Sequence, residues 1–357
     1  MEKIYIADIQ SICNAKNQCV GHWFALAKNY IALFKEKCDV VVAGGPVYRE
    51  EFGKYSYLSL PKNVTDGMGC LSRYLAFYLN ARYLFNKAQR QTIVMQYGSP
   101  FSTHIAVLLG YKKSNVYLIE YSTVGIQGLL KQIVWALLKK RVCGVICPTE
   151  EVGEKFSVPY CVVPDYIFTG KFFICSSSYY EKKYDFCVIG RLNKDKGIIE
   201  IINALKGKGC SVLIAGKPDN PDYYNSILQS ANGSSNIKLH LDYLSTIEYQ
   251  SYLNQSRYAI LNYQSEYSNR SSGVVFDTLF AGLPVIGNRC SSLQFIEDNG
   301  LGMVYENLNN IDLISILNES FYNRCLANIA DYCKENKKSS EKLANFITLN
   351  NKYSNQI

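Results

Sequence analysis

Short apolar runs alternate with longer amphipathic stretches along the first half of the chain. Uninterrupted apolar runs are typical of strands buried on both faces, and a strand–helix alternation favours a parallel sheet with crossover helices. Strands are predicted at residues 3–9, 38–45, 92–98, 115–122, 142–147 and 160–167. Helices are predicted at residues 22–37, 73–90 and 127–141.

The same alternation begins again after a polar, serine-rich segment. Strands are predicted at residues 184–190, 210–216, 236–243, 258–263 and 284–287. Helices are predicted at residues 197–207, 222–231, 246–255 and from 271 to a stop at Gly282. We therefore expect an α/β protein with an N-terminal domain (1–168), a linker (169–183), a C-terminal domain (184–310) and C-terminal helices (311–357), with the polar run 334–342 as a loop.

Composition supports a two-domain globular protein. The 357 residues are 48% hydrophobic and 19% charged, which is typical of folded chains and long for a single core. Thirteen cysteines without a Cys-x-x-Cys pair favour reduced thiols and a cytoplasmic location. The longest apolar stretches, such as residues 133–138, are too short to cross a bilayer.

Positive charge is concentrated in the first half. Lys and Arg outnumber Asp and Glu by 38 to 30, and nearly all of the excess lies within residues 1–168. A nucleic acid could bind such a basic half, but no basic run has the spacing of a nucleic-acid motif. An anionic membrane surface or a phosphate-bearing acceptor would explain the charge equally well. Lys131, Trp135 and Lys139 form one helical stripe, which predicts weak peripheral attachment at the cytoplasmic face; the alternative is a core helix with solvated lysines.

One predicted helix begins with small residues. In "RSSGVVFDTLFAGLPVIG", Ser271, Ser272 and Gly273 form the start, and Gly282 before Pro284 forms the stop. A helix start without bulky side chains exposes amides that bind anions. Asp277 follows one turn later and leans toward the same opening, where it would hold sugar hydroxyls. This pattern indicates a nucleotide-sugar site, and the alternative is an ordinary cap with a solvated Asp277.

Three further loops follow predicted strands of the second half. Ligands bind at the carboxyl ends of strands in open parallel sheets. "GRLNKDKG" carries Arg191 and Lys196 around a glycine turn, which suits a diphosphate, although a basic surface turn is the alternative. "GKPDN" (216–220) is the second loop, and "DYLS" offers Tyr243 and Leu244 to a nucleobase.

These segments, in this order over roughly residues 143–305, resemble the donor half of a family 4 glycosyltransferase. The resemblance implies the GT-B fold, two Rossmann-like parallel-sheet domains that face a cleft. It places Arg191 and Lys196 on the family's phosphate-binding pair and Asp277 on a glutamate that holds the ribose. The family's second glutamate falls on Asn269, with Glu266 nearby but out of register.

The same resemblance implies a retaining, metal-independent hexosyltransferase of surface polysaccharide biosynthesis. Its donor would be a UDP- or GDP-linked sugar, with no further cofactor, and its acceptor a glycan, lipid-linked if the basic half serves it. No Asp-x-Asp metal motif occurs. Where the family has a histidine after a first-domain strand, this chain has Glu120, and His22 is a weaker candidate for the same domain.

The expected residues fall into two groups. The catalytic group comprises Glu120, Arg191 and Lys196. The donor-binding group comprises Arg191, Lys196, Tyr243, Leu244, Arg270, Ser271, Ser272, Gly273 and Asp277. Two alternatives stay open because the family pattern is incomplete: an inactive donor-binding partner of another transferase, and a hydrolysing sugar-nucleotide epimerase.

Overall fold

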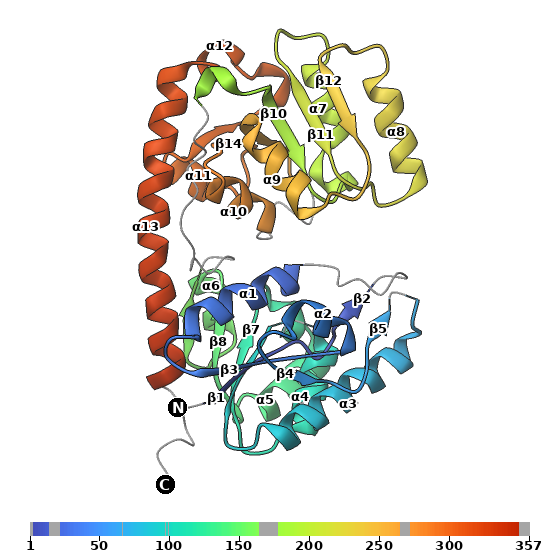
Figure 1. Cartoon of the computed structure of the whole chain (residues 1–357), viewed down its shortest axis with the longest axis vertical. Helices are drawn as coiled ribbons and strands as arrows, with labels where there is room; N and C mark the ends of the chain where they lie inside the picture. The colour runs from blue at the N-terminus through green and yellow to red at the C-terminus, as the bar shows by residue number, and fades with distance from the viewer. Residues whose placement is uncertain are drawn as a thin grey trace. The chain divides into compact units, whose positions relative to one another are not determined.

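The chain folds into two compact units, each built on a parallel sheet (Figure 1). The computed structural model describes residues 3–13, 22–65, 67–96, 98, 100–163, 178–264 and 272–349. The first unit comprises Met1–Gly170 with Asn336–Ile357, and the second comprises Lys171–Glu335. The expected fold class, α/β with two Rossmann-like parallel sheets, is confirmed.

The first unit has a seven-stranded sheet between two helical layers. In spatial order its strands are β4 (Ser56–Ser59), β3 (Asp39–Gly44), β1 (Lys3–Ala7), β6 (Thr92–Met95), β7 (Asn115–Ile119), β8 (Val142–Cys147) and β9 (Tyr160–Val162). Its helices are α1 (His22–Phe34), α2 (Arg49–Phe52), α3 (Cys70–Lys87), α4 (Phe101–Gly110), α5 (Leu129–Leu138) and α6 (Glu150–Lys155). A small ladder joins β2 (Ile12–Cys13) to β5 (Val64–Thr65). One core lies under α3, α4 and α5, and another under α1, because alternate strand residues point to opposite faces.

The second unit has a six-stranded sheet. In spatial order its strands are β12 (Ile237–His240), β11 (Val212–Ala215), β10 (Tyr184–Ile189), β13 (Ser256–Leu261), β14 (Val285–Asn288) and β15 (Gly302–Tyr305). Its helices are α7 (Ile198–Leu205), α8 (Pro221–Ala231), α9 (Thr246–Asn254), α10 (Gly273–Phe280), α11 (Gln294–Asp298) and α12 (Leu313–Ile316). Chain order therefore reverses between β10 and β13, and ligands of such sheets bind beside a reversal of this kind, at the carboxyl ends of the strands.

The long helix α13 (Glu319–Leu349) belongs to both units. The expected loop at residues 334–342 is wrong, because this polar run is helical throughout. Lys and Glu favour helices, and Asn336, Ser340 and Leu343 place one buried face at helical spacing. Leu343 and Ile347 pack into the core of the first unit, where the Tyr117 hydroxyl donates to the Ile347 carbonyl at 2.9 Å.

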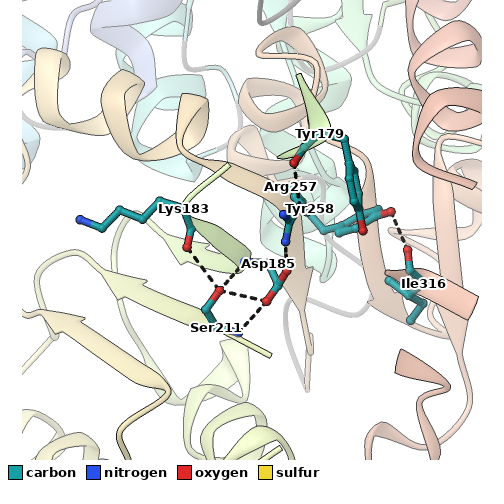
Figure 2. Close-up of polar contacts among 7 residues, drawn as sticks. All are labelled: Tyr179, Lys183, Asp185, Ser211, Arg257, Tyr258 and Ile316. Carbon is teal, nitrogen blue, oxygen red and sulfur yellow. Dashed lines mark hydrogen bonds and ion pairs between the residues drawn. The ribbon is translucent and has the colours of Figure 1, made fainter. Parts of the chain in front are cut away.

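A charged network joins the amino ends of three strands in the second unit (Figure 2). The Asp185 carboxylate accepts the Ser211 amide at 2.7 Å and the Ser211 hydroxyl at 2.9 Å. It also pairs with the Arg257 guanidinium, whose Nε donates to the Tyr179 carbonyl at 3.0 Å. Nearby, the Tyr258 hydroxyl donates to the Ile316 carbonyl at 2.6 Å. These contacts lie at the edge opposite the strand ends that bind ligands, so we assign them to stability.

None of the eleven cysteines among the described residues takes part in a disulfide bond. Burial raises the pKa of several, for example Cys187 to about 12, which keeps them protonated. In the described part of the chain, no helix is both long enough and apolar enough to cross a membrane.

Candidate functional site

In the candidate site of the second unit, the backbones of the loops after β10 and β11 are in close contact. Gly190 follows β10 with a φ of 96°, and Gly216 follows β11 with a φ of 145°. A Cβ on Gly216 would lie 1.7 Å from the Gly190 carbonyl oxygen, so only glycine fits there. Leu192 and Pro218 continue this pairing as an isolated bridge. The contact fixes the loop that carries Arg191 and Lys196.

Lys196 is a buried cation at the carboxyl end of β10. It ends a 3₁₀ turn, Lys194–Lys196, and only 5% of its surface is exposed. Gly197 follows in the left-handed region, and a Cβ there would lie 2.4 Å from Asn262 Nδ2. The pKa of Lys196 is lowered to about 8, mainly by burial and also by the Arg191 charge, although Asp219 and Asp277 oppose the shift. A buried ammonium of this kind is prepared for an anionic ligand.

Arg191 lies on the same loop as Lys196, but its side chain is mostly exposed. Its Nε donates to Asp219 Oδ1 at 2.5 Å. Asp219 comes from the "GKPDN" loop after β11, which the Leu192–Pro218 bridge holds in register. The structure thus brings both cations of the predicted phosphate pair to one end of the sheet and adds an acidic neighbour to them.

Asp277 reaches this region from α10. Its Oδ2 accepts a hydrogen bond from the Tyr249 hydroxyl at 3.1 Å, and it acts electrostatically on Lys196. A Cβ on Gly190 would lie 3.3 Å from Val274 Cγ2, 3.8 Å from Lys196 Nζ and 4.0 Å from Tyr249 Cε2. The bare face of Gly190 therefore lies next to Lys196, which was expected to hold a donor, and next to Val274 and Tyr249, which were not.

The start of α10 differs from the expected cap. Ser272 is the N-cap residue, but its side chain makes no capping hydrogen bond. Instead, the Tyr263 hydroxyl donates to Ser272 Oγ at 2.7 Å, which ties the helix start to the end of β13. Ser272 Oγ therefore accepts from the buried Tyr263 hydroxyl and not from a backbone amide of α10. The expected stop is confirmed: Gly282 has a φ of 72° and donates to the Leu279 carbonyl.

Tyr243 and Leu244 lie after β12, on the same edge of the sheet. Tyr243 is exposed, and Leu244 packs against the core beneath α9. Ser245 caps α9 through a capping box with Glu248. Their predicted contact with a nucleobase stays a prediction.

Glu120 lies at the carboxyl end of β7 in the first unit and is completely buried. Its Oε1 is 2.8 Å from His104 Nε2, and the His104 ring lies 5.3 Å from that of Trp135. A Cβ on Gly98 would lie 2.5 Å from the same Glu120 oxygen. A carboxylate enclosed in this way orders its neighbours, and the structure gives it no exposed surface on which to meet a substrate.

Helix α5 does not present tryptophan to solvent. Trp135 is buried, and its indole nitrogen donates to the Phe156 carbonyl at 2.8 Å. The expected surface stripe of Lys131, Trp135 and Lys139 is therefore wrong at Trp135, because Trp135 and Leu138 form the packed side of the helix. The opposite side is unusually apolar: Leu129, Leu130, Ile133 and Leu137 are each more than half exposed.

Several expected residues lie outside the described part of the chain. These are Glu266, Asn269, Arg270 and Ser271. His22 begins α1, and its side chain is not described. Among the described residues, no group of three or more His, Cys, Asp or Glu side chains is arranged to hold a metal ion.

Sequence reasoning missed three contributors to the site: Asp219, Tyr249 and Tyr263. Asp219 lies in a loop that the strand pattern had already marked, so its position was a usable signal. The two tyrosines carry no comparable signal, because their roles depend on hydroxyls meeting Asp277 and Ser272 across the sheet edge.

Comparison with known proteins shows the fold. No protein-family model and no curated protein matches this sequence. Among solved structures, a glycosyltransferase from Rickettsia africae superposes with a TM-score of 0.71 at 12% identity, covering 99% of each chain. HepE from Anabaena, in complex with UDP and glucose, gives 0.66 at 11% identity over 98% of this chain and all of HepE.

TarM matches over a smaller part of its length. The TM-score is 0.56 at 16% identity, covering 76% of this chain and 58% of TarM, so this chain spans less than two thirds of that protein. Together with the two parallel sheets and the strand order of each, these likenesses show that the chain has the two-domain Rossmann-like architecture called GT-B.

Proposed function

We propose that the protein is a glycosyltransferase that moves a hexose from a nucleotide-sugar donor to a glycan acceptor. One observation carries the proposal: Lys196 is buried beside the bare face of Gly190, within electrostatic reach of Arg191 and Asp277. A buried ammonium and an arginine suit a diphosphate, and a carboxylate one helical turn beyond a helix start suits ribose hydroxyls. The glycosyltransferase-like fold and the resemblance to family 4 support the same assignment.

The chemistry that this site favours is departure of a nucleoside diphosphate. Lys196, Arg191 and the amino end of α10 would stabilise the negative charge that develops on the leaving phosphate. We propose that no metal takes part and that the anomeric configuration is retained, as in family 4. The donor would be a UDP- or GDP-linked sugar, and Tyr243 and Leu244, which follow β12 at the same edge of the sheet, would contact its base. Glu120, being enclosed, is assigned to ordering the first unit around His104.

We further propose a lipid-linked acceptor and peripheral attachment to an anionic membrane on the cytoplasmic side, in surface polysaccharide biosynthesis. The apolar side of α5 lies next to Lys139, Lys140 and Arg141, a combination that fits an anionic lipid surface. Lys131 contributes less, because its ammonium donates to the Val124 carbonyl at 2.8 Å.

The test is a panel of labelled UDP- and GDP-hexoses, with and without lipid-linked acceptors. Slow hydrolysis or transfer from one donor is expected. Lys196→Met should lose this activity, and Lys194→Met should keep it, because Lys194 lies at the exposed end of the same turn and serves as the matched control. The anomer of the product, followed by NMR, tests retention. Saturable binding without turnover on any acceptor would replace the enzyme with a donor-binding partner.

A further inference from the structure

Tyr249 lies on the inner side of α9, where it faces the donor site. Its ring is part of the core beneath α9, and its Cε2 is 4.0 Å from the position of a Cβ on Gly190. Its hydroxyl donates to Asp277 Oδ2 at 3.1 Å. The tyrosine therefore connects the helix that packs against β10 with the carboxylate on α10.

We propose that Tyr249 is a positioning residue that holds the Asp277 carboxylate in the orientation that recognises the ribose of the donor. This inference rests on the proposed function and assigns a role to a residue that no part of that proposal used. Aspartate is one methylene shorter than glutamate, so the Asp277 carboxylate can contact the ribose hydroxyls only if its side chain is held in one rotamer. A hydrogen bond from a ring anchored in the core supplies that restraint.

The chemistry of the pair supports a lasting hydrogen bond. Burial and the neighbouring Asp277 carboxylate raise the pKa of Tyr249 well above its ordinary value, so the hydroxyl keeps its proton at neutral pH. The tyrosine is therefore a donor, and one Asp277 oxygen is its acceptor. A carboxylate in this position accepts from vicinal hydroxyls, which a ribose presents and a 2′,3′-dideoxyribose lacks.

The same helix offers a matched control. Tyr252 lies three residues further along α9, and its hydroxyl pairs with His240 Nδ1 at 2.8 Å instead of with Asp277. Tyr249→Phe and Tyr252→Phe each remove one phenolic oxygen from one partly buried tyrosine. A difference between them therefore reports on Asp277 and not on the loss of a hydroxyl from α9.

The experiment measures binding of UDP and GDP and of their 2′,3′-dideoxy analogues to the full chain by calorimetry. For whichever base binds, wild type and Tyr252→Phe are expected to prefer the ribonucleotide. In Tyr249→Phe that preference should fall about tenfold, the size expected for one hydrogen bond to a charged group. Affinity for the dideoxy analogue should stay unchanged, which a merely unfolded or loosened variant would not show.

Two results would overturn the inference, and they are distinguishable. If wild type prefers the ribonucleotide and Tyr249→Phe keeps the full preference, Tyr249 does not position Asp277, while the proposed function stands. If wild type binds neither nucleotide, the proposed function fails and this inference fails with it. Asp277→Ala, which removes both carboxylate oxygens, provides the reference for complete loss of ribose recognition, and Tyr249→Phe should approach that value without reaching it.

Discussion

The buried ammonium of Lys196 is expected to lower the stability of the fold and to raise the affinity for the donor. Its ammonium is buried beside Gly190, so Lys196→Met removes a desolvated charge and keeps most of the side-chain volume. Donor affinity should fall about 10- to 100-fold, the loss of a charge-assisted hydrogen bond, while the melting temperature stays equal or rises. Lys194→Met should change neither quantity. A fall in melting temperature with unchanged affinity would make Lys196 structural.

The lowered pKa of Lys196 predicts opposite pH effects on binding and on stability. Without ligand the pKa is about 8, and an anionic ligand favours the protonated form. Donor affinity should therefore be constant below about pH 7 and decline above pH 8. The unfolded chain binds more protons at this lysine, so the free energy of unfolding should rise between about pH 8 and 10. Calorimetric titration measures the donor affinity over this pH range, and urea denaturation measures the free energy of unfolding. Both pH dependences should be absent in Lys196→Met.

In our proposal, Arg191 and Lys196 stabilise the negative charge of the leaving diphosphate, which a metal ion does in other transferases. Turnover and donor affinity should therefore survive excess EDTA. The check is an assay of chelated protein followed by addition of Mg²⁺ or Mn²⁺. Activity that is lost with EDTA and restored by either ion would show that Arg191 and Lys196 are insufficient.

At the scale of elements, the central strands of both sheets were predicted, whereas the edge strands β4 and β15 and several helical details were not. Apolar runs such as Phe186–Ile189 in β10 and Tyr258–Leu261 in β13 identify strands buried on both faces. Helix α4 was missed because "FSTHIAVLLG" is apolar on nearly every side, and a period of 3.6 is then invisible. For the same reason the packed side of α5 was misjudged: the pattern contains enough apolar residues for either side.

The site shows the same division. Arg191, Lys196 and Asp277 follow strands or begin a helix, so the topology of a parallel sheet was enough to place them near each other. Tyr249 had no such marker, since it is one of 29 tyrosines and only the packing of α9 on β10 brings it to Asp277. The pattern of hydrophobic and polar residues does not predict hydrogen bonds from hydroxyls between elements that are distant in the sequence.

The network that joins the amino ends of β10, β11 and β13 predicts a stability effect. The Arg257 and Asp185 side chains are 18% and 12% exposed, whereas those of Arg289 and Glu297 are 44% and 42% exposed. Arg257→Ala leaves a nearly buried carboxylate without its cation and should cost about 3–5 kcal/mol. Arg289→Ala should cost no more than about 1 kcal/mol. Urea denaturation compares them, and equal costs would remove any special role for the network of Figure 2.

At the scale of the whole molecule, the excess of positive charge and the exposed apolar side of α5 both belong to the first unit. The basic excess of residues 1–168 and the four exposed apolar side chains of α5 occur together, while the proposed donor site belongs to the second unit. In our proposal the first unit binds the acceptor and the membrane, and the second unit binds the donor. Membrane binding and donor binding should then be separable by mutation.

Membrane attachment should accordingly depend on the apolar side of α5 and not on its tryptophan. Each large aliphatic side chain inserted contributes roughly 1.5–3 kcal/mol, and each nearby lysine about 1 kcal/mol. Ile133→Glu with Leu137→Glu should abolish co-sedimentation with anionic vesicles at low salt, and Lys139→Glu with Lys140→Glu should weaken it. Both pairs should leave binding of free donor unchanged. Trp135→Phe is the control, because Trp135 is buried and donates to Phe156, and that variant should bind vesicles as wild type does. If the wild-type protein ignores anionic vesicles, or if both glutamate pairs bind as it does, the apolar side of α5 serves another purpose.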